Sequence, residues 1–261
     1  MEYVDFGPIG LRIHRPTGTT GNVPGLLWIH GGGYVIGTAA QDDAVCQHLA
    51  HEVGVVVAAV DYRLAPEHPF PTPLHDCHDA LAWLAERPDV DTDRIAIGGA
   101  SAGGGLAAAL ALLSRDRGEV RPVFQLLSYP MLDDRTAARR DLDDRCTRLW
   151  NNRSNSYAWS SYLGQPPGGP DIDPLAAPAR SGDLTGLPPA WIGVGTHDLL
   201  LEENLAYAAA LVAAGVGCNI ETFDGAFHGF DSVRPAAGLT QRFRRSQVEA
   251  LRTGLMSPAG C

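Results

Sequence analysis

Short runs of β-branched and aliphatic residues recur along the chain, and segments with helical spacing of apolar positions lie between them. The apolar runs predict strands that are buried on both faces, at residues 25–30, 54–61, 94–98, 123–128, 191–195 and 219–223. The helical patterns fall at residues 44–52, 75–86, 103–117, 202–214 and about 241–251. Because strands alternate with helices, this order predicts an α/β fold in which a mostly parallel sheet carries helices on both faces.

Two segments depart from this alternation. Residues 3–6 and 11–14 flank a turn-forming Gly-Pro-Ile-Gly, which predicts an antiparallel hairpin at the sheet edge. Residues 133–189 form a long insertion with Pro/Gly-rich stretches and tryptophans, and long insertions are often lids. Its aromatic stretch favours a partly helical cap over the site, with a disordered excursion as the alternative. A length of 261 residues fits one domain, 1–261, that includes the insertion.

Charge and cysteine usage restrict the partners and the compartment. Twenty basic and thirty acidic residues give a net charge of −10, which disfavours nucleic acid as a partner. The start of the chain has no signal-peptide pattern, and no apolar run is long enough to span a bilayer, so we expect no stable membrane insertion. An odd, scattered set of cysteines fits a reduced cytoplasmic setting; they are Cys46, Cys77, Cys146, Cys218 and Cys261.

The strongest chemical signal is a serine at a strand-to-helix turn. The predicted strand at 94–98 runs into the sequence GASAG at 99–103 and then into an Ala/Leu-rich helix, with Ser101 at the turn. A nucleophile elbow has this arrangement, because the strained turn exposes the serine and small neighbours let strand and helix approach closely. The motif alone is weak, since the same residues also make a tight helix start.

A glycine-rich loop supplies a candidate oxyanion hole. The sequence HGGGY at 30–34 follows the strand at 25–30, and glycines let backbone amides approach a developing oxyanion. We expect the amides of Gly32, Gly33 and Ala102 to serve, and Tyr34 to line the substrate pocket. A merely flexible loop is the alternative; a phosphate-binding loop would show GxGxxG or a following Lys-Ser/Thr.

A late acid and a late histidine complete a candidate triad. Asp198 and His228 each follow a predicted strand, and the order Ser, Asp, His is that of the α/β-hydrolases. A serine hydroxyl needs a histidine base, and that imidazole needs a carboxylate to hold its tautomer. His197 is the strongest rival for the base, whereas His30 is expected to order the glycine loop.

A metal site is the weaker interpretation of the sequence HDCHD at 75–79. Residues three and four apart share a helix face, but the cluster lacks HExxH order and evident distant ligands. We therefore expect no metal and no organic cofactor.

Several motifs together resemble one family, the bacterial hormone-sensitive-lipase-like α/β-hydrolases. They are HGGGY, DYRLAPEHPFP at 61–71, GASAGG, YPMLDD at 129–134, DLTGLPP at 183–189, HDLLLEE and FHGF. The chain looks most similar to the heroin-esterase-like carboxylesterases. The resemblance implies an α/β-hydrolase fold, the triad Ser101, Asp198 and His228, and hydrolysis of short- to medium-chain carboxylic esters without a metal or cofactor.

Three departures from the family pattern affect the site. Ala100 stands where relatives usually have an acidic residue, which removes a hydrogen-bonding group from the turn. The acid motif keeps Asp198 but loses a proline. Relatives usually carry several dozen residues of helical cap before the edge hairpin, so we expect the N-terminal cap to be largely absent. Exposed apolar pocket walls would then favour association into a homo-oligomer.

The sequence thus predicts a serine carboxylesterase that acts through an acyl-enzyme on small-molecule esters. An amide or formamide hydrolase of the arylformamidase or peptidase type would use the same triad and stays open. A non-catalytic ligand-binding homologue also stays open, because a hydrolase scaffold can bind without turning over.

Overall fold

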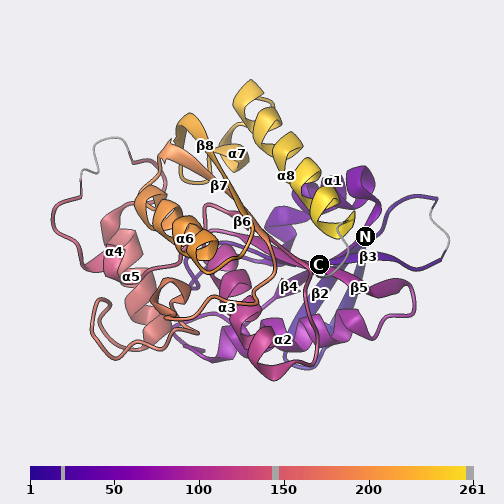
Figure 1. Ribbon diagram of the computed structural model, residues 1–261, viewed down its shortest axis with the longest axis horizontal. Coiled ribbons are helices and arrows are strands. Elements are labelled where there is room, and N and C mark those ends of the chain that lie inside the picture. Colours follow the sequence, from indigo (N-terminus) through magenta and orange to yellow (C-terminus); the bar gives the residue numbers. More distant parts are fainter. Residues whose placement is uncertain (19–20, 143–146, 257–261) are drawn as a thin grey trace.

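The computed structural model describes residues 1–18, 21–142 and 147–256, and within them one mixed sheet organises the chain (Figure 1). The strand order is β1-β2-β4-β3-β5-β6-β7-β8, antiparallel from β1 through β2 to β4 and parallel elsewhere. The edge hairpin and the mostly parallel sheet are therefore confirmed. The strands are β1 (Glu2–Phe6), β2 (Ile9–His14), β3 (Val23–Ile29), β4 (Val56–Asp61), β5 (Val90–Ala100), β6 (Phe124–Ser128), β7 (Ala190–His197) and β8 (Cys218–Phe227).

Helices cover both faces of the sheet. Helices α1 and α8 pack on one face, and α2, α3 and α6 pack on the other (Figure 1). Their bounds are α1 (Asp43–Leu49), α2 (Thr72–Ala85), α3 (Ala102–Arg117), α4 (Arg135–Ala138), α5 (Asn152–Leu163), α6 (Leu201–Ala213), α7 (Phe230–Val233) and α8 (Gly238–Met256). Throughout the described ranges, no helix is both long and apolar enough to cross a membrane.

Some helices and strands begin or end at residues other than expected, because a glycine or the pairing of strands sets the boundary. The helix expected at 44–52 is α1 followed by a π-helical turn, Ala50–Gly54, which ends at Gly54 with φ +79°. The strand expected from residue 54 therefore starts at Val56. Strand β5 starts four residues earlier than expected, because Val90 pairs with Val23 of β3 ahead of a register shift.

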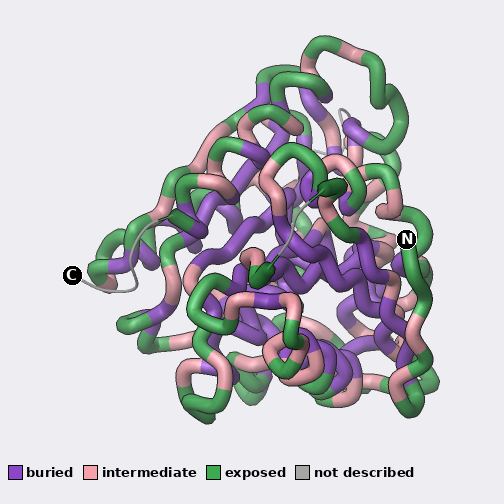
Figure 2. Tube along the Cα trace, turned by 90° about the vertical axis from the view of Figure 1, so that its right-hand side faces the viewer, coloured by how far each residue is buried: buried purple, intermediate pink, exposed green. Residues whose placement is uncertain are grey.

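The parallel strands bury side chains on both faces, which explains their continuous apolar runs. In β3, Leu27 and Ile29 belong to the core under α2 and α3, whereas Leu26 and Trp28 belong to the core under α1 and α8. Buried residues accordingly run through the centre of the molecule, with exposed ones on its outside (Figure 2).

The insertion between β6 and β7 is partly helical and packs on the sheet domain. Helix α5 begins at an Asn151 cap whose side chain accepts the Ser154 amide, and its Trp159 and Tyr162 are buried. The buried Asp134 pairs with Arg180 and accepts the Gly168 amide, which ties the two ends of the insertion together. Contacts of this kind disfavour a disordered excursion for the described part of 133–189.

At the turn from β5 into α3, the backbone lies very close to the end of β3. A Cβ on Gly103 would lie 2.0 Å from the Ile29 carbonyl oxygen at the end of β3, and one on Gly99 would lie 2.5 Å from that oxygen. Only glycine fits where two strands and a helix meet at these separations. The small residues of GASAG are therefore required by packing.

Helix α6 holds the loop that follows β6. Glu203 Oε1 accepts the amides of Leu132 at 2.8 Å and Asp133 at 3.3 Å, and Asn204 Nδ2 donates to the Pro130 carbonyl at 2.8 Å. Burial raises the pKa of Glu203 from its ordinary 4.5 to about 8. Glu203 is therefore protonated at neutral pH in the folded protein.

We expect Gly103→Ala to lower the free energy of unfolding by roughly 2 kcal/mol or more, because the added methyl group has no space beside Ile29. Thermal or urea unfolding measures the loss. Gly182→Ala is the matched control, since no atom lies within 4 Å of its Cβ position. Equal stability of the two variants would contradict the close approach.

We expect Glu203→Gln to become more stable relative to the wild type as pH rises from 5 to 8. In that window the unfolded chain ionises Glu203 while the folded chain keeps it protonated, so the wild type loses stability that the glutamine variant retains. The gap should grow by roughly 2–4 kcal/mol across the window. Urea unfolding at several pH values measures it. The exposed neighbour serves as control, and Glu202→Gln should show no such trend.

Candidate active site

The three candidate catalytic side chains meet at the carboxyl end of the sheet. Ser101 follows β5, Asp198 follows β7 and His228 follows β8. Ser101 Oγ lies 2.8 Å from His228 Nε2, and His228 Nδ1 donates to Asp198 Oδ2 at 2.9 Å. Residues far apart in the chain thus form one hydrogen-bonded relay of serine, imidazole and carboxylate.

The backbone of Ser101 is held in a rarely populated conformation. Its φ of 55° and ψ of −119° place a non-glycine residue in the positive-φ region. The Ser101 amide donates to the Ser128 carbonyl at 2.9 Å, and its carbonyl accepts the amides of Gly105 and Met131. These bonds fix the turn so that Oγ points at the imidazole.

The glycine loop lies directly beside the nucleophile. A Cβ on Gly31 would lie 3.3 Å from Ser101 Cβ, and Gly32 and Gly33 have φ of +125° and +60°. No backbone carbonyl of the described residues accepts the amide of Gly32 or Gly33. Ala102 is the first residue of α3, where helix amides have no intrahelical partner. These three amides are therefore free to bind a developing oxyanion.

His30 orders this loop as expected. Its ring Nδ1 donates to the Gly31 carbonyl at 2.7 Å and stacks on Tyr62 at 4.3 Å, and Tyr62 OH donates to the His30 carbonyl. Burial lowers the His30 pKa, so the ring stays neutral and keeps its Nδ1 proton. His30 thus holds the glycine loop through its contacts with Gly31 and Tyr62, and it is not hydrogen-bonded to Ser101.

Tyr34 lies in the core rather than at an open wall. It is 1% exposed, stacks on Tyr162 at 4.0 Å and donates to the Met131 carbonyl at 3.3 Å. These contacts anchor the glycine loop in the core. Tyr34 itself has a positive φ of 66°. A place at the substrate pocket stays a prediction.

The geometry distinguishes His197 from His228 as candidates for the general base. His197 ends β7 with an exposed side chain, one residue before the acid. Asp198 is buried, and its second oxygen accepts the Leu200 amide at 2.9 Å, which orients the carboxylate toward His228. Only His228 has its ring between the serine and the acid.

Sequence reasoning missed two aromatic neighbours of His228. The ring of Tyr129 lies edge-on at 5.0 Å, and the ring of Trp150 lies at 5.9 Å. Tyr129 begins the YPMLDD motif directly after β6, a position that could have signalled a role at the sheet edge. Trp150 lies in the irregular insertion, where no periodic pattern marks it.

Two further acidic residues, Asp231 and Asp42, have pKa values that burial raises. Tyr129 OH donates to Asp231 Oδ1 at 2.7 Å, and burial raises the Asp231 pKa. Asp42 accepts Trp28 Nε1 at 2.8 Å, and burial, reinforced by the Asp231 charge, raises its pKa to about 6. Burial therefore favours the protonated, neutral form of both carboxyl groups.

The polar side chains of the sequence HDCHD at 75–79 are paired with other residues or exposed. Asp76 accepts the Arg63 amide and guanidinium, while His78 lies 3.3 Å from Glu119 and His75 is exposed. In the part of the chain that the structure describes, no three His, Cys, Asp or Glu side chains cluster to hold a metal ion.

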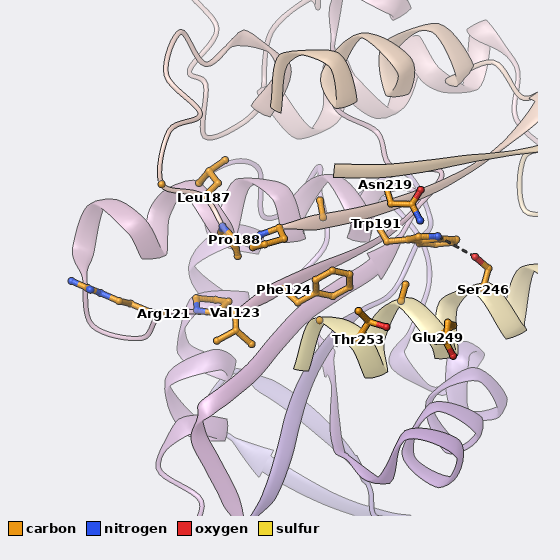
Figure 3. Close-up of a pocket in the computed structure, with 16 residues that line it drawn as sticks. Arg121, Val123, Phe124, Leu187, Pro188, Trp191, Asn219, Ser246, Glu249 and Thr253 are labelled. Atoms are coloured by element: carbon orange, nitrogen blue, oxygen red, sulfur yellow. Dashed lines mark hydrogen bonds between the residues drawn. The ribbon is translucent and has the colours of Figure 1, made fainter. Parts of the chain in front are cut away.

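A large cavity lies at the opposite end of the sheet. Its volume is about 860 Å³, and it opens between α8 and the loop before β7, with Phe124 and Trp191 as its aromatic walls (Figure 3). Its lining comes from α8 and from the amino ends of β6, β7 and β8, whereas the triad residues follow the carboxyl ends of β5, β7 and β8. None of the triad residues lines it, so it is separate from the candidate active site.

Comparison with known proteins agrees with this geometry. A family model described as the alpha/beta hydrolase fold matches residues 26–232. Esterase LipI of Mycobacterium tuberculosis is 38% identical over 244 residues, covering 88% of this chain and 74% of the relative. Ethyl acetate hydrolase of Pseudomonas putida is 33% identical over 234 residues, covering 87% and 72%.

Solved structures extend the similarity to three dimensions. The bacterial heroin esterase superposes with a TM-score of 0.90 at 43% identity, over 95% of this chain and 80% of that one. Esterase LipW from Mycobacterium marinum gives 0.88 at 35% identity, over 98% and 81%. The resemblance inferred from the motifs is confirmed: this chain belongs to the hormone-sensitive-lipase-like branch of the α/β-hydrolase family.

Proposed function

We propose that this α/β-hydrolase is a serine carboxylesterase that cleaves short- to medium-chain carboxylic esters through an acyl-enzyme on Ser101. The observation that carries the proposal is the continuous relay from Ser101 Oγ through His228 to Asp198, at 2.8 and 2.9 Å. A protein that only bound its ligand would need no such relay. Relatives named as esterases favour ester over amide substrates.

The reaction follows from the positions of the groups. His228 Nε2 takes the Ser101 proton as Oγ attacks the ester carbonyl, and Asp198 stabilises the resulting imidazolium. The amides of Gly32, Gly33 and Ala102 bind the oxyanion of the tetrahedral intermediate. His228 then protonates the departing alcohol, and in the second half it activates the water that releases the acid.

We propose further that residues 1–261 act as one domain with 133–189 as its cap. Support comes from the packing of Tyr162, on the insertion, against Tyr34, which follows the glycines proposed to bind the oxyanion. A cytoplasmic setting is supported by the free thiols of Cys46, Cys77 and Cys218; Cys146 and Cys261 lie outside the described residues. Association into a homo-oligomer stays a prediction.

We expect Ser101→Ala to lower kcat/KM for p-nitrophenyl acetate by roughly 10³-fold or more, because no other hydroxyl replaces the nucleophile. Initial rates measure the loss, and an unchanged melting temperature shows that the fold survives. A fluorophosphonate probe should label the wild type and not the variant. Activity near the wild-type level would refute the assignment.

We expect His228→Ala to lose at least roughly 10³-fold in kcat/KM, and His197→Ala to stay within about twofold of the wild type. The two residues end neighbouring strands, but only His228 contacts Ser101. The same assay on both variants decides between them. A larger loss in His197→Ala would transfer the base role to that residue.

A further inference from the structure

The insertion brings an aromatic side chain directly against the reacting groups. A Cβ on Gly33 would lie 2.4 Å from Cη2 of the Trp150 indole. The same indole ring lies 5.9 Å from the His228 imidazole, between ring centroids. Trp150 therefore contacts both the proposed oxyanion loop and the proposed general acid.

Trp150 is held in this position from within the insertion. Its Nε1 donates to Asn155 Oδ1 at 3.3 Å, and Asn155 is fully buried on α5. A residue of α5 thus helps to orient the indole. A rigid aromatic wall of this kind orders at low entropic cost when it binds a ligand.

Leu149 extends the same wall toward solvent. Its Cδ1 lies 3.7 Å from the Cβ position of Gly229, next to His228, yet 66% of the residue is exposed. Its φ of 62° is unusual for leucine and projects it beside the histidine loop. Together, Leu149 and Trp150 present apolar side chains beside the proposed catalytic histidine, and an apolar part of a ligand can pack on them.

The geometry of the tetrahedral intermediate decides which part of the substrate meets this wall. Its carbon carries Ser101 Oγ, the oxyanion, the leaving oxygen and the acyl chain. The oxyanion lies against the glycine amides, and the leaving oxygen must lie within hydrogen-bond reach of His228 Nε2. A ring that contacts Gly33 and His228 together lies along the edge between those two oxygens. The acyl chain points away from that edge.

We propose that Trp150 and Leu149 form the binding site for the alcohol part of the ester, and that it selects apolar, above all aromatic, alcohol groups. The inference rests on the proposed esterase function and assigns the specificity of that site. An aromatic alcohol would pack on the indole and cover the exposed leucine, whereas a small alkyl alcohol would contact little of either.

Two substrate series separate the alcohol side from the acyl side. Benzyl acetate against ethyl acetate varies only the alcohol, and ethyl hexanoate against ethyl acetate varies only the acyl chain. Trp150→Ala should lower the benzyl-to-ethyl ratio of kcat/KM by about tenfold and leave the hexanoate-to-acetate ratio within about twofold. Comparing ratios between variant and wild type cancels the intrinsic reactivity of each ester.

Controls keep the test specific. Trp150→Phe retains a ring and should restore most of the benzyl preference. Leu149→Ala, at an exposed position that should tolerate the change, should lower the benzyl-to-ethyl ratio by roughly threefold even where Trp150→Ala fails to fold. Tyr157→Ala removes another exposed aromatic of the insertion, in a hollow that contains no triad residue, and should change neither ratio.

The outcomes separate this inference from the esterase proposal. A wild type that hydrolyses none of the esters overturns the esterase proposal itself. An active wild type whose benzyl-to-ethyl ratio is unchanged by Leu149→Ala, and by Trp150→Ala where that variant folds, overturns the alcohol site alone. A fall in the hexanoate-to-acetate ratio in place of the benzyl-to-ethyl ratio assigns the wall to the acyl chain and also overturns it.

Discussion

The positive φ of Ser101 is the constraint on which the rest of the site depends. A non-glycine residue in that region costs about 1–3 kcal/mol, so the surrounding structure must supply the difference. It does so with backbone bonds from three directions, to Ser128, Gly105 and Met131. The glycines at 99 and 103 follow from the same requirement, because any side chain there would push α3 off the end of β3.

The acid loop and the nucleophile turn are mechanically linked through α6. Asp198 lies just before this helix, and Glu203 and Asn204 on its first turn hold residues 130–133. Met131 in that loop donates to the Ser101 carbonyl. A shift of α6 would therefore move the acid and the serine together, which preserves the relay geometry better than two independent loops would.

The parts of the structure that were predictable are those encoded by local periodicity and chain order. The apolar runs of β3 to β8 and the HGGG loop depend on neighbours within a few residues, and the Ser, Asp, His order is a property of chain order alone. Tyr34 shows what local sequence does not predict. Its place next to the glycine loop does not tell whether its side chain faces the substrate or the core, and in the structure it is buried. The position of Trp150 was not predictable either. Which residue of the insertion lies beside His228 depends on the packing of α5, and no local pattern encodes that packing.

The insertion contacts the glycine loop at two adjacent residues, Gly33 and Tyr34. Tyr162 stacks on Tyr34 at one end, and Trp150 lies on Gly33 at the other. Sequence changes in α5 that move Trp150 would therefore also act on the glycine loop that is proposed to bind the oxyanion. With the proposed roles, substrate preference and transition-state stabilisation are coupled, because an amide displaced by a fraction of an ångström loses much of its effect on the oxyanion. The ion pair of the buried Asp134 with Arg180 anchors the insertion at its base and so limits the movement of both contacts.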